Sequence, residues 1–87
     1  MPAGVTDRFG PLSATWQLVA TGAGYCSVEA IENPARWATT MSGSAPAAGV
    51  DGHTIEQGTS IHMELVADQR LWVRGKGHIV RTAANPA

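Results

Sequence analysis

The chain has 87 residues, with six Lys/Arg, seven Asp/Glu and a formal net charge of -1. This length suits a single domain, and the charge excludes the basic character of an electrostatic nucleic-acid binder. Charged residues make up only 15% of the chain, against roughly 25% in ordinary soluble domains. Such a weakly charged surface suits a protein that packs against neighbouring protein.

A chain this small usually needs a disulfide, a metal or a partner subunit to supplement its core. Cys26 is the single cysteine, so no disulfide can form within one copy, which leaves metal or self-association.

No stretch approaches the roughly 18 apolar residues of a membrane span. The N-terminus lacks the apolar run of a secretion signal. We therefore expect a chain made in the cytoplasm that binds neither membranes nor nucleic acid.

Three parts are expected along the chain. Residues 1–12 are rich in Gly and Pro and predict an extended N-terminal arm. Residues 13–82 predict the folded domain, and residues 83–87 a short C-terminal tail. No helical period of 3.6 residues is evident in the domain, and short runs of β-branched and aromatic residues recur instead.

The expected strands are divided by turn residues and cover 13–21, 25–32, 35–41, 59–67, 70–74 and 78–83, with a brief pairing at 53–56. Helix propensity alone would allow a helix over 27–40, but Pro34 and the β-branched ends favour strands. Strands of this length and spacing predict an all-β fold, a small antiparallel β-sandwich or jelly-roll-like barrel. We expect the last three strands to form a meander with tight hairpins. The Gly-, Ser- and Ala-rich residues 42–58 are expected to cross between the sheets.

The alternation of apolar residues along these strands also predicts the core. The inward-facing side chains are expected to be Leu18, Val28, Ile61, Met63, Leu65, Leu71, Val73 and one of Ile79 or Val80.

The sequence contains few patterns typical of a metal site or an enzyme active site. Cupin enzymes place two histidines one residue apart, followed by a Glu, on a strand; the corresponding run here is "IHMEL", with His62 and Glu64 and no second His. Cys26 lies on an alternating strand, where a small buried apolar residue is the usual interpretation. No nucleophile elbow or phosphate-binding loop occurs. We expect no catalytic residues, no metal and no cofactor. A metal-dependent barrel enzyme remains a minor alternative.

The run "RLWVR" raises the question of what covers a tryptophan that shares one strand face with two arginines. Either the arginine stems cover Trp72 within the chain, or a neighbouring protein does, since Trp and Arg are enriched at interfaces. We expect the interface, formed by Arg70, Trp72 and Arg74. Arg8 and Phe9 of the arm are expected to contribute to it.

Residues 13–82 resemble small virion proteins of tailed bacteriophages. The shared layout is a loop ending in "GH", a strand of alternating apolar residues, an "LWVRG" strand and a last strand with "V-x-T". It begins with "WQLVATGAGYCSVE" near the first Trp.

This resemblance implies a structural protein of the virion that decorates and stabilises a phage capsid as a cement protein. Its partners would be the major capsid protein and further copies of itself, as a homo-oligomer (a trimer or dimer). The alternative is a fibre or receptor-binding module in which Trp72, Trp16 or Tyr25 stacks on carbohydrate.

Overall fold

The computed structural model of the chain describes residues 5–41 and 43–86. In these residues the chain forms eight β-strands: β1 (Val5–Leu12), β2 (Gln17–Thr21), β3 (Gly24–Ala30), β4 (Ala35–Thr40), β5 (His53–Ile55), β6 (Ser60–Leu65), β7 (Arg70–Gly75) and β8 (Gly77–Ala83). The described part contains no helix with the length and hydropathy needed to cross a membrane. Each sequence-predicted strand has a counterpart among β2–β8, although β2 begins at Gln17 and not at residue 13, and β1 is additional.

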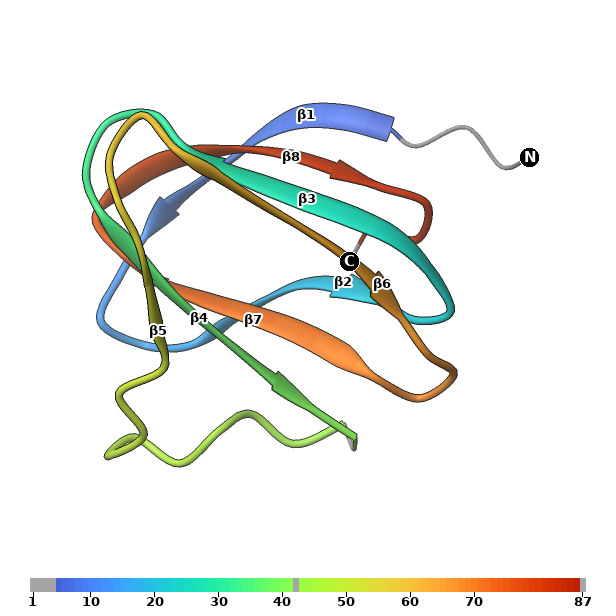
Figure 1. Cartoon of the computed structure of the whole chain (residues 1–87). Coiled ribbons are helices and arrows are strands. Elements are labelled where there is room, and N and C mark those ends of the chain that lie inside the picture. Colours follow the sequence, from blue (N-terminus) through green and yellow to red (C-terminus); the bar gives the residue numbers. More distant parts are fainter. Residues whose placement is uncertain (1–4, 42, 87) are drawn as a thin grey trace.

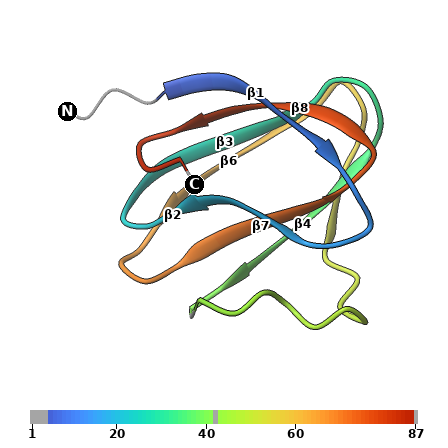
Figure 2. The same ribbon diagram turned by 180° about the vertical axis from the view of Figure 1, so that it is seen from behind.

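The strands form two antiparallel sheets of four strands each, shown from two sides in Figures 1 and 2. One sheet has the order β1-β8-β3-β6 and the other β2-β7-β4-β5. Apolar side chains of both sheets meet between them. The prediction of a small antiparallel β-sandwich is therefore confirmed.

The last three strands do not form the predicted meander. β6 pairs with β3, β7 pairs with β2 and β4, and β8 pairs with β1 and β3. The turns after β6 and β7 carry the chain from one sheet to the other, and tight turns serve hairpins and sandwich corners equally well. The prediction that 42–58 crosses between the sheets is confirmed, because β4 precedes this segment in one sheet and β6 follows it in the other. Residues 43–52 join β4 to β5 within one sheet, so the crossing itself follows β5.

The N-terminal residues correct the prediction of a separate arm. Residues 5–12 are β1, an edge strand paired with β8 from Val5↔Ala83 to Leu12↔Gly77. The register shifts between Phe9 and Leu12, where Gly10 and Pro11 stand. This irregularity accommodates the Gly and Pro that suggested an arm. Residues 1–4 of the predicted arm lie outside the described residues.

The core follows the predicted alternation with one exception. Val28, Leu65, Leu71, Val73 and Ile79 are buried, and Ile61 and Met63 are half-buried against them. Leu18 was expected inside but lies opposite Trp72 and is only half-buried, whereas Val19 is fully buried. The register of β2 and β7 shifts between Leu18 and Ala20. This bulge changes the face on which the following side chains lie.

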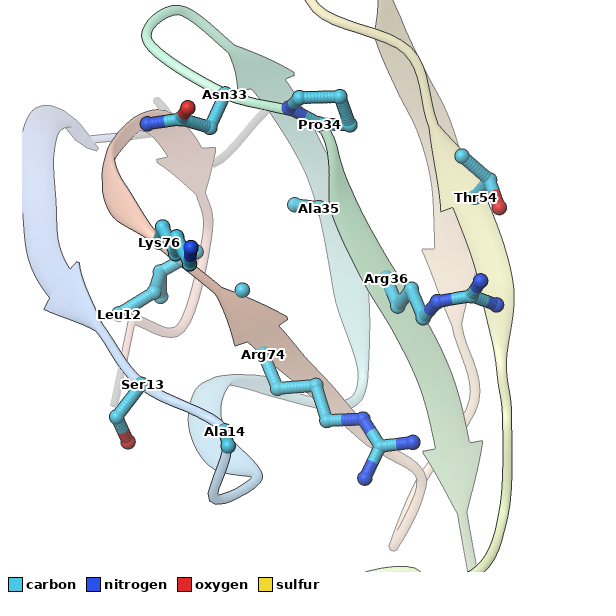
Figure 3. Close-up of a pocket in the computed structure, with 11 residues that line it drawn as sticks. Leu12, Ser13, Ala14, Asn33, Pro34, Ala35, Arg36, Thr54, Arg74 and Lys76 are labelled. Carbon is cyan, nitrogen blue, oxygen red and sulfur yellow. The ribbon is translucent and has the colours of Figure 1, made fainter.

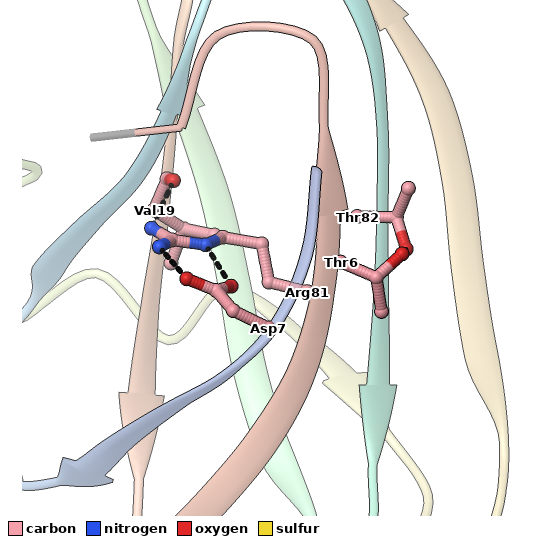
Figure 4. A network of polar contacts seen from close by, with 5 residues as sticks. All are labelled: Thr6, Asp7, Val19, Arg81 and Thr82. Carbon is pink, nitrogen blue, oxygen red and sulfur yellow. Dashed lines mark hydrogen bonds and ion pairs between the residues drawn. The ribbon is translucent and has the colours of Figure 1, made fainter. Parts of the chain in front are cut away.

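A charged side chain ties the two sheets together (Figure 4). Arg81 of β8 is buried and donates from Nε and Nη2 to the Asp7 carboxylate at 2.9 and 2.6 Å. Its Nη1 donates to the carbonyl oxygen of Val19 in the opposite sheet at 2.9 Å, and its guanidinium lies 4.7 Å from the centroid of the Phe9 ring. The bonds from Arg81 hold the pKa of Asp7 below its usual value.

Candidate functional site

The molecule itself covers Trp72. The side chain is 8% exposed, and its indole Nε1 donates to the Thr40 hydroxyl of β4 at 2.9 Å. Leu18 of β2 and Ala38 of β4 lie directly opposite Trp72 on the neighbouring strands. Of the two explanations for a tryptophan between arginines, the structure favours cover from within the chain, and little of Trp72 is left for a partner protein or a sugar to contact.

Arg74, from the same predicted interface, secures a loop over a different tryptophan. Its guanidinium lies 4.5 Å from the ring centroid of Trp16, and Nη1 and Nη2 donate to the carbonyl oxygens of Ala48 and Val50 at 3.0 and 2.6 Å. Trp16 is 6% exposed, and its indole N–H has no hydrogen-bond partner among the described residues. The loop 43–52 is thus held against the sheet mainly through backbone carbonyls.

A shallow groove lies where the β1–β2 connection meets the β3–β4 and β7–β8 turns (Figure 3). Its volume is about 690 Å³. The residues that line it combine a small apolar floor with hydroxyl, amide and cationic groups: Leu12, Ser13, Ala14, Asn33, Pro34, Ala35, Arg36, Thr54, Arg74, Gly75 and Lys76.

The charges around the groove are unbalanced. Arg36, Arg74 and Lys76 are half of the chain's six Lys/Arg, and no described residue that lines the groove is acidic. Arg36 of β4 lies directly opposite Arg74 of β7 in the strand register. Like charges in that position repel and destabilise a sheet. The guanidinium groups of both arginines donate to backbone carbonyls; Arg36 Nη1 donates to the carbonyl oxygen of Asp51 at 3.4 Å.

This arrangement can bind an anion. Ion pairs between described residues all lie elsewhere in the fold, so the three cations of the groove have no carboxylate partner in the described part of the chain. Guanidinium groups bind carboxylates and phosphates through paired N–H donors. An acidic group placed between the side chains of Arg36 and Arg74 would relieve the repulsion between them.

The other predicted interface residues lie apart from the groove. Arg70 begins β7 and donates to the carbonyl oxygen of Asp68 at 3.0 Å. Arg8 is on β1 in the opposite sheet, 61% exposed and 3.5 Å from Glu32. Phe9, its neighbour, packs half-buried against the core. The structure therefore separates the five predicted residues into two sheets and keeps only Arg74 in the groove.

Glu32 also holds the histidine of the last strand. Its Oε1 accepts bonds from the His78 backbone N–H and Nδ1 at 2.5 and 2.9 Å. These bonds from His78, with the nearby Arg8 charge, lower the pKa of Glu32. In the part of the chain that the structure describes, no group of three or more His, Cys, Asp and Glu is placed to hold a metal ion.

Sequence reasoning missed two of the three groove cations, Arg36 and Lys76. Each follows a turn signal, Asn33-Pro34 for Arg36 and Gly75 for Lys76. The two turns are far apart in the chain, and only the strand order brings them together at one end of the sandwich. Cations beside turns were the available signal, but without the sheet order they do not point to one site.

No protein-family model matches this chain, and comparisons with curated proteins and with solved structures also find no match. The class of protein is therefore defined by the fold: a small all-β sandwich of two four-stranded antiparallel sheets in the described residues, with a cationic groove at one end.

Proposed function

We propose that this chain is a structural protein of a tailed-phage particle that decorates and stabilises the capsid by docking onto capsid subunits. The groove of Arg36, Arg74 and Lys76 supports a docking role, because it gathers cations without a carboxylate partner in the described residues. The partner is expected to present an acidic segment to it. The "LWVRG" run on which the phage resemblance rests is part of β7, which supplies Arg74.

A second feature supports docking to protein. Five of the described large apolar side chains are exposed: Val50 lies in the loop 43–52, and Val5, Tyr25, Met41 and Val66 lie at the strand ends opposite the groove. Exposed apolar side chains gathered in one region are typical of surfaces that contact protein. The sandwich thus carries exposed apolar side chains at the end opposite the groove.

The test is reconstitution with particles that lack the chain. Added protein should bind saturably, raise the temperature at which the particles release their genome, and bind more weakly as salt increases. Arg36→Gln and Lys76→Gln should each weaken binding by roughly tenfold, in the range of lost charge pairs at interfaces. Arg8→Gln, a matched neutralisation on the opposite sheet, should bind normally. Equal losses for Arg8→Gln and Lys76→Gln would remove the groove from the docking surface.

The second candidate function is a fibre or receptor-binding module, favoured by one exposed aromatic pair. Tyr25 and His62 stack with ring centroids 6.3 Å apart, and the Tyr25 hydroxyl is 2.9 Å from His62 Nδ1. Trp16 and Trp72 are buried, so Tyr25 alone of the three predicted aromatic residues can meet a sugar face. Selective binding on a glycan array that Tyr25→Ala abolishes, with no binding to capsids, would establish this function instead.

A further inference from the structure

The edges of the two sheets are not equally protected. β1 carries Pro11 in a register shift, β2 has a register shift and a bridge from Ala20 to Pro86, and β5 has only three residues. β6 is six residues long and pairs with β3 in continuous register from Gly24↔Leu65 to Glu29↔Ser60. Its sequence, "SIHMEL", contains no Pro, Lys or Gly. An unprotected edge of this kind is a template for another strand.

The backbone groups at this edge can be assigned from the pairing with β3. The Ala30 N–H donates to the Thr59 carbonyl at 3.0 Å, so the backbone at position 59 faces β3. Backbone groups point alternately to the two sides of a strand. Those of Ser60, His62 and Glu64 therefore point away from β3, to the open margin of the sheet visible in Figure 1.

The apolar face at the same edge is incompletely covered. Ile61 and Met63 point inward and are only half-buried, although they pack against the core. A further strand beside β6 would cover them with its own apolar side chains. The edge therefore presents free backbone groups and a partly exposed apolar margin together.

The side-chain pattern of β6 is complementary to itself. An antiparallel copy that continues the sheet must pair side chains on the same face, so the twofold axis has to pass through a residue. With the axis at His62, Ile61 meets Met63 of the other copy on the inner face. On the outer face Ser60 meets Glu64, and the two His62 rings lie beside each other. All three outward-pointing backbone positions of β6 then exchange hydrogen bonds across the axis, whereas a register centred on Met63 would use only His62 and Glu64 within the strand.

We propose that β6 pairs with β6 of a second copy of this chain, antiparallel and centred on His62, to give a continuous eight-stranded sheet across a twofold dimer. The occupant of the edge is a second copy because the strand supplies its own complement on both faces. No residue of β6 lines the groove, so the pairing of β6 does not use it. This inference is independent of the proposed docking to capsids, and it is tested on the chain alone.

The test uses charge at positions 60 and 64, which only this register places opposite each other. Sedimentation of the purified chain should show a concentration-dependent dimer. Ser60→Glu introduces a carboxylate opposite Glu64 at two symmetric places across the axis. It should raise the dimer Kd roughly 2- to 30-fold, from two like-charge cross-strand pairs. Ser60→Glu combined with Glu64→Lys should restore the dimer, and Ser60→Lys should lower the Kd.

Thr39→Glu, an exposed position on β4 of the other sheet, is the matched control and should dimerise normally. Ser60 lies opposite Glu29 of β3 within one copy, so Ser60→Glu can also weaken the fold. Thermal unfolding of each variant separates loss of dimer from loss of fold. A chain that stays monomeric at millimolar concentration overturns the proposal. So does a dimer whose Kd is unchanged by Ser60→Glu, since that dimer uses another surface or register.

Discussion

Replacing Arg81 by Met tests whether the buried guanidinium is what holds the two sheets together. The variant keeps most of the side-chain volume but leaves the Val19 carbonyl without its donor and Asp7 without its ion pair. Val19 is fully buried, and an orphaned buried acceptor costs about 1–3 kcal/mol. The Asp7 side chain is 40% exposed, so water can hydrate its carboxylate once Arg81 is gone. Breaking this ion pair therefore costs well below the roughly 3–5 kcal/mol of a fully buried pair.

We therefore expect Arg81→Met to lower the free energy of unfolding by about 2–4 kcal/mol. The total free energy of unfolding of a chain of this length is roughly 4–13 kcal/mol. The expected loss corresponds to a fall in Tm of roughly 8–30 °C. Urea unfolding followed by tryptophan fluorescence measures it. Arg8→Met, on the adjacent strand but exposed, is the control and should cost about 0.5 kcal/mol or less. A loss below about 1 kcal/mol for Arg81→Met, less than one orphaned buried acceptor, would refute the reasoning.

The same variant should change the acid dependence of stability. The bonds from Arg81 lower the pKa of Asp7 from its ordinary 3.8, so the folded state favours the carboxylate. This contribution is present above the ordinary pKa of 3.8 and is lost as the pH falls through the lowered pKa of the folded state. In Arg81→Met the free energy of unfolding should decline less steeply below about pH 4 than in the parent chain. Parallel declines in the two proteins would show that Asp7 is not held by Arg81.

Three further outcomes are expected. Gly52→Ala should lower the free energy of unfolding by about 1–3 kcal/mol, because Gly52 has φ +74 and an added Cβ would lie 2.7 Å from a backbone oxygen. Gly49→Ala, where nothing lies within 4 Å of an added Cβ, should be nearly neutral in the same thermal melts. Arg74→Ala should release loop 43–52, seen as faster protease cleavage there and red-shifted tryptophan emission; unchanged cleavage would show that the loop holds itself. Burial raises the pKa of the Cys26 thiol to about 11, so a disulfide reagent at about pH 8 should label it only after unfolding. The stability linked to this thiol is present below pH 9.0 and is lost as the pH rises toward 11; rapid labelling of the folded chain would contradict the burial.

The strands of this protein could be predicted because their determinants are local. Alternation in "YCSVEA" and "SIHMEL" fixes which side chains face inward, and Asn33-Pro34 and the paired glycines 75 and 77 mark where strands end. Leu18 shows the limit of this reasoning. Its strand contains a bulge, and an alternating pattern read from sequence assumes that no residue is extra.

The candidate site could not be predicted to the same degree. "RLWVR" correctly marked β7 as unusual, but whether Trp72 is open or closed depends on Thr40, Leu18 and Ala38 of two neighbouring strands. The opposed Arg36 and Arg74 become one feature only when β4 and β7 pair. The local sequence predicts which face of a strand a cation lies on. It does not predict which side chains of other strands will be its neighbours.

By itself, then, the amino-acid sequence determined an all-β chain with short strands, an alternating core and no intrachain disulfide, because backbone preferences and side-chain period act over a few residues. Tertiary structure alone decided the strand order, the inclusion of residues 5–12 as β1, the tie of Arg81 across the sheets and the cationic groove. These features join residues that are far apart in the chain. Their energies depend on burial and on the charges that happen to become neighbours, which no local pattern specifies.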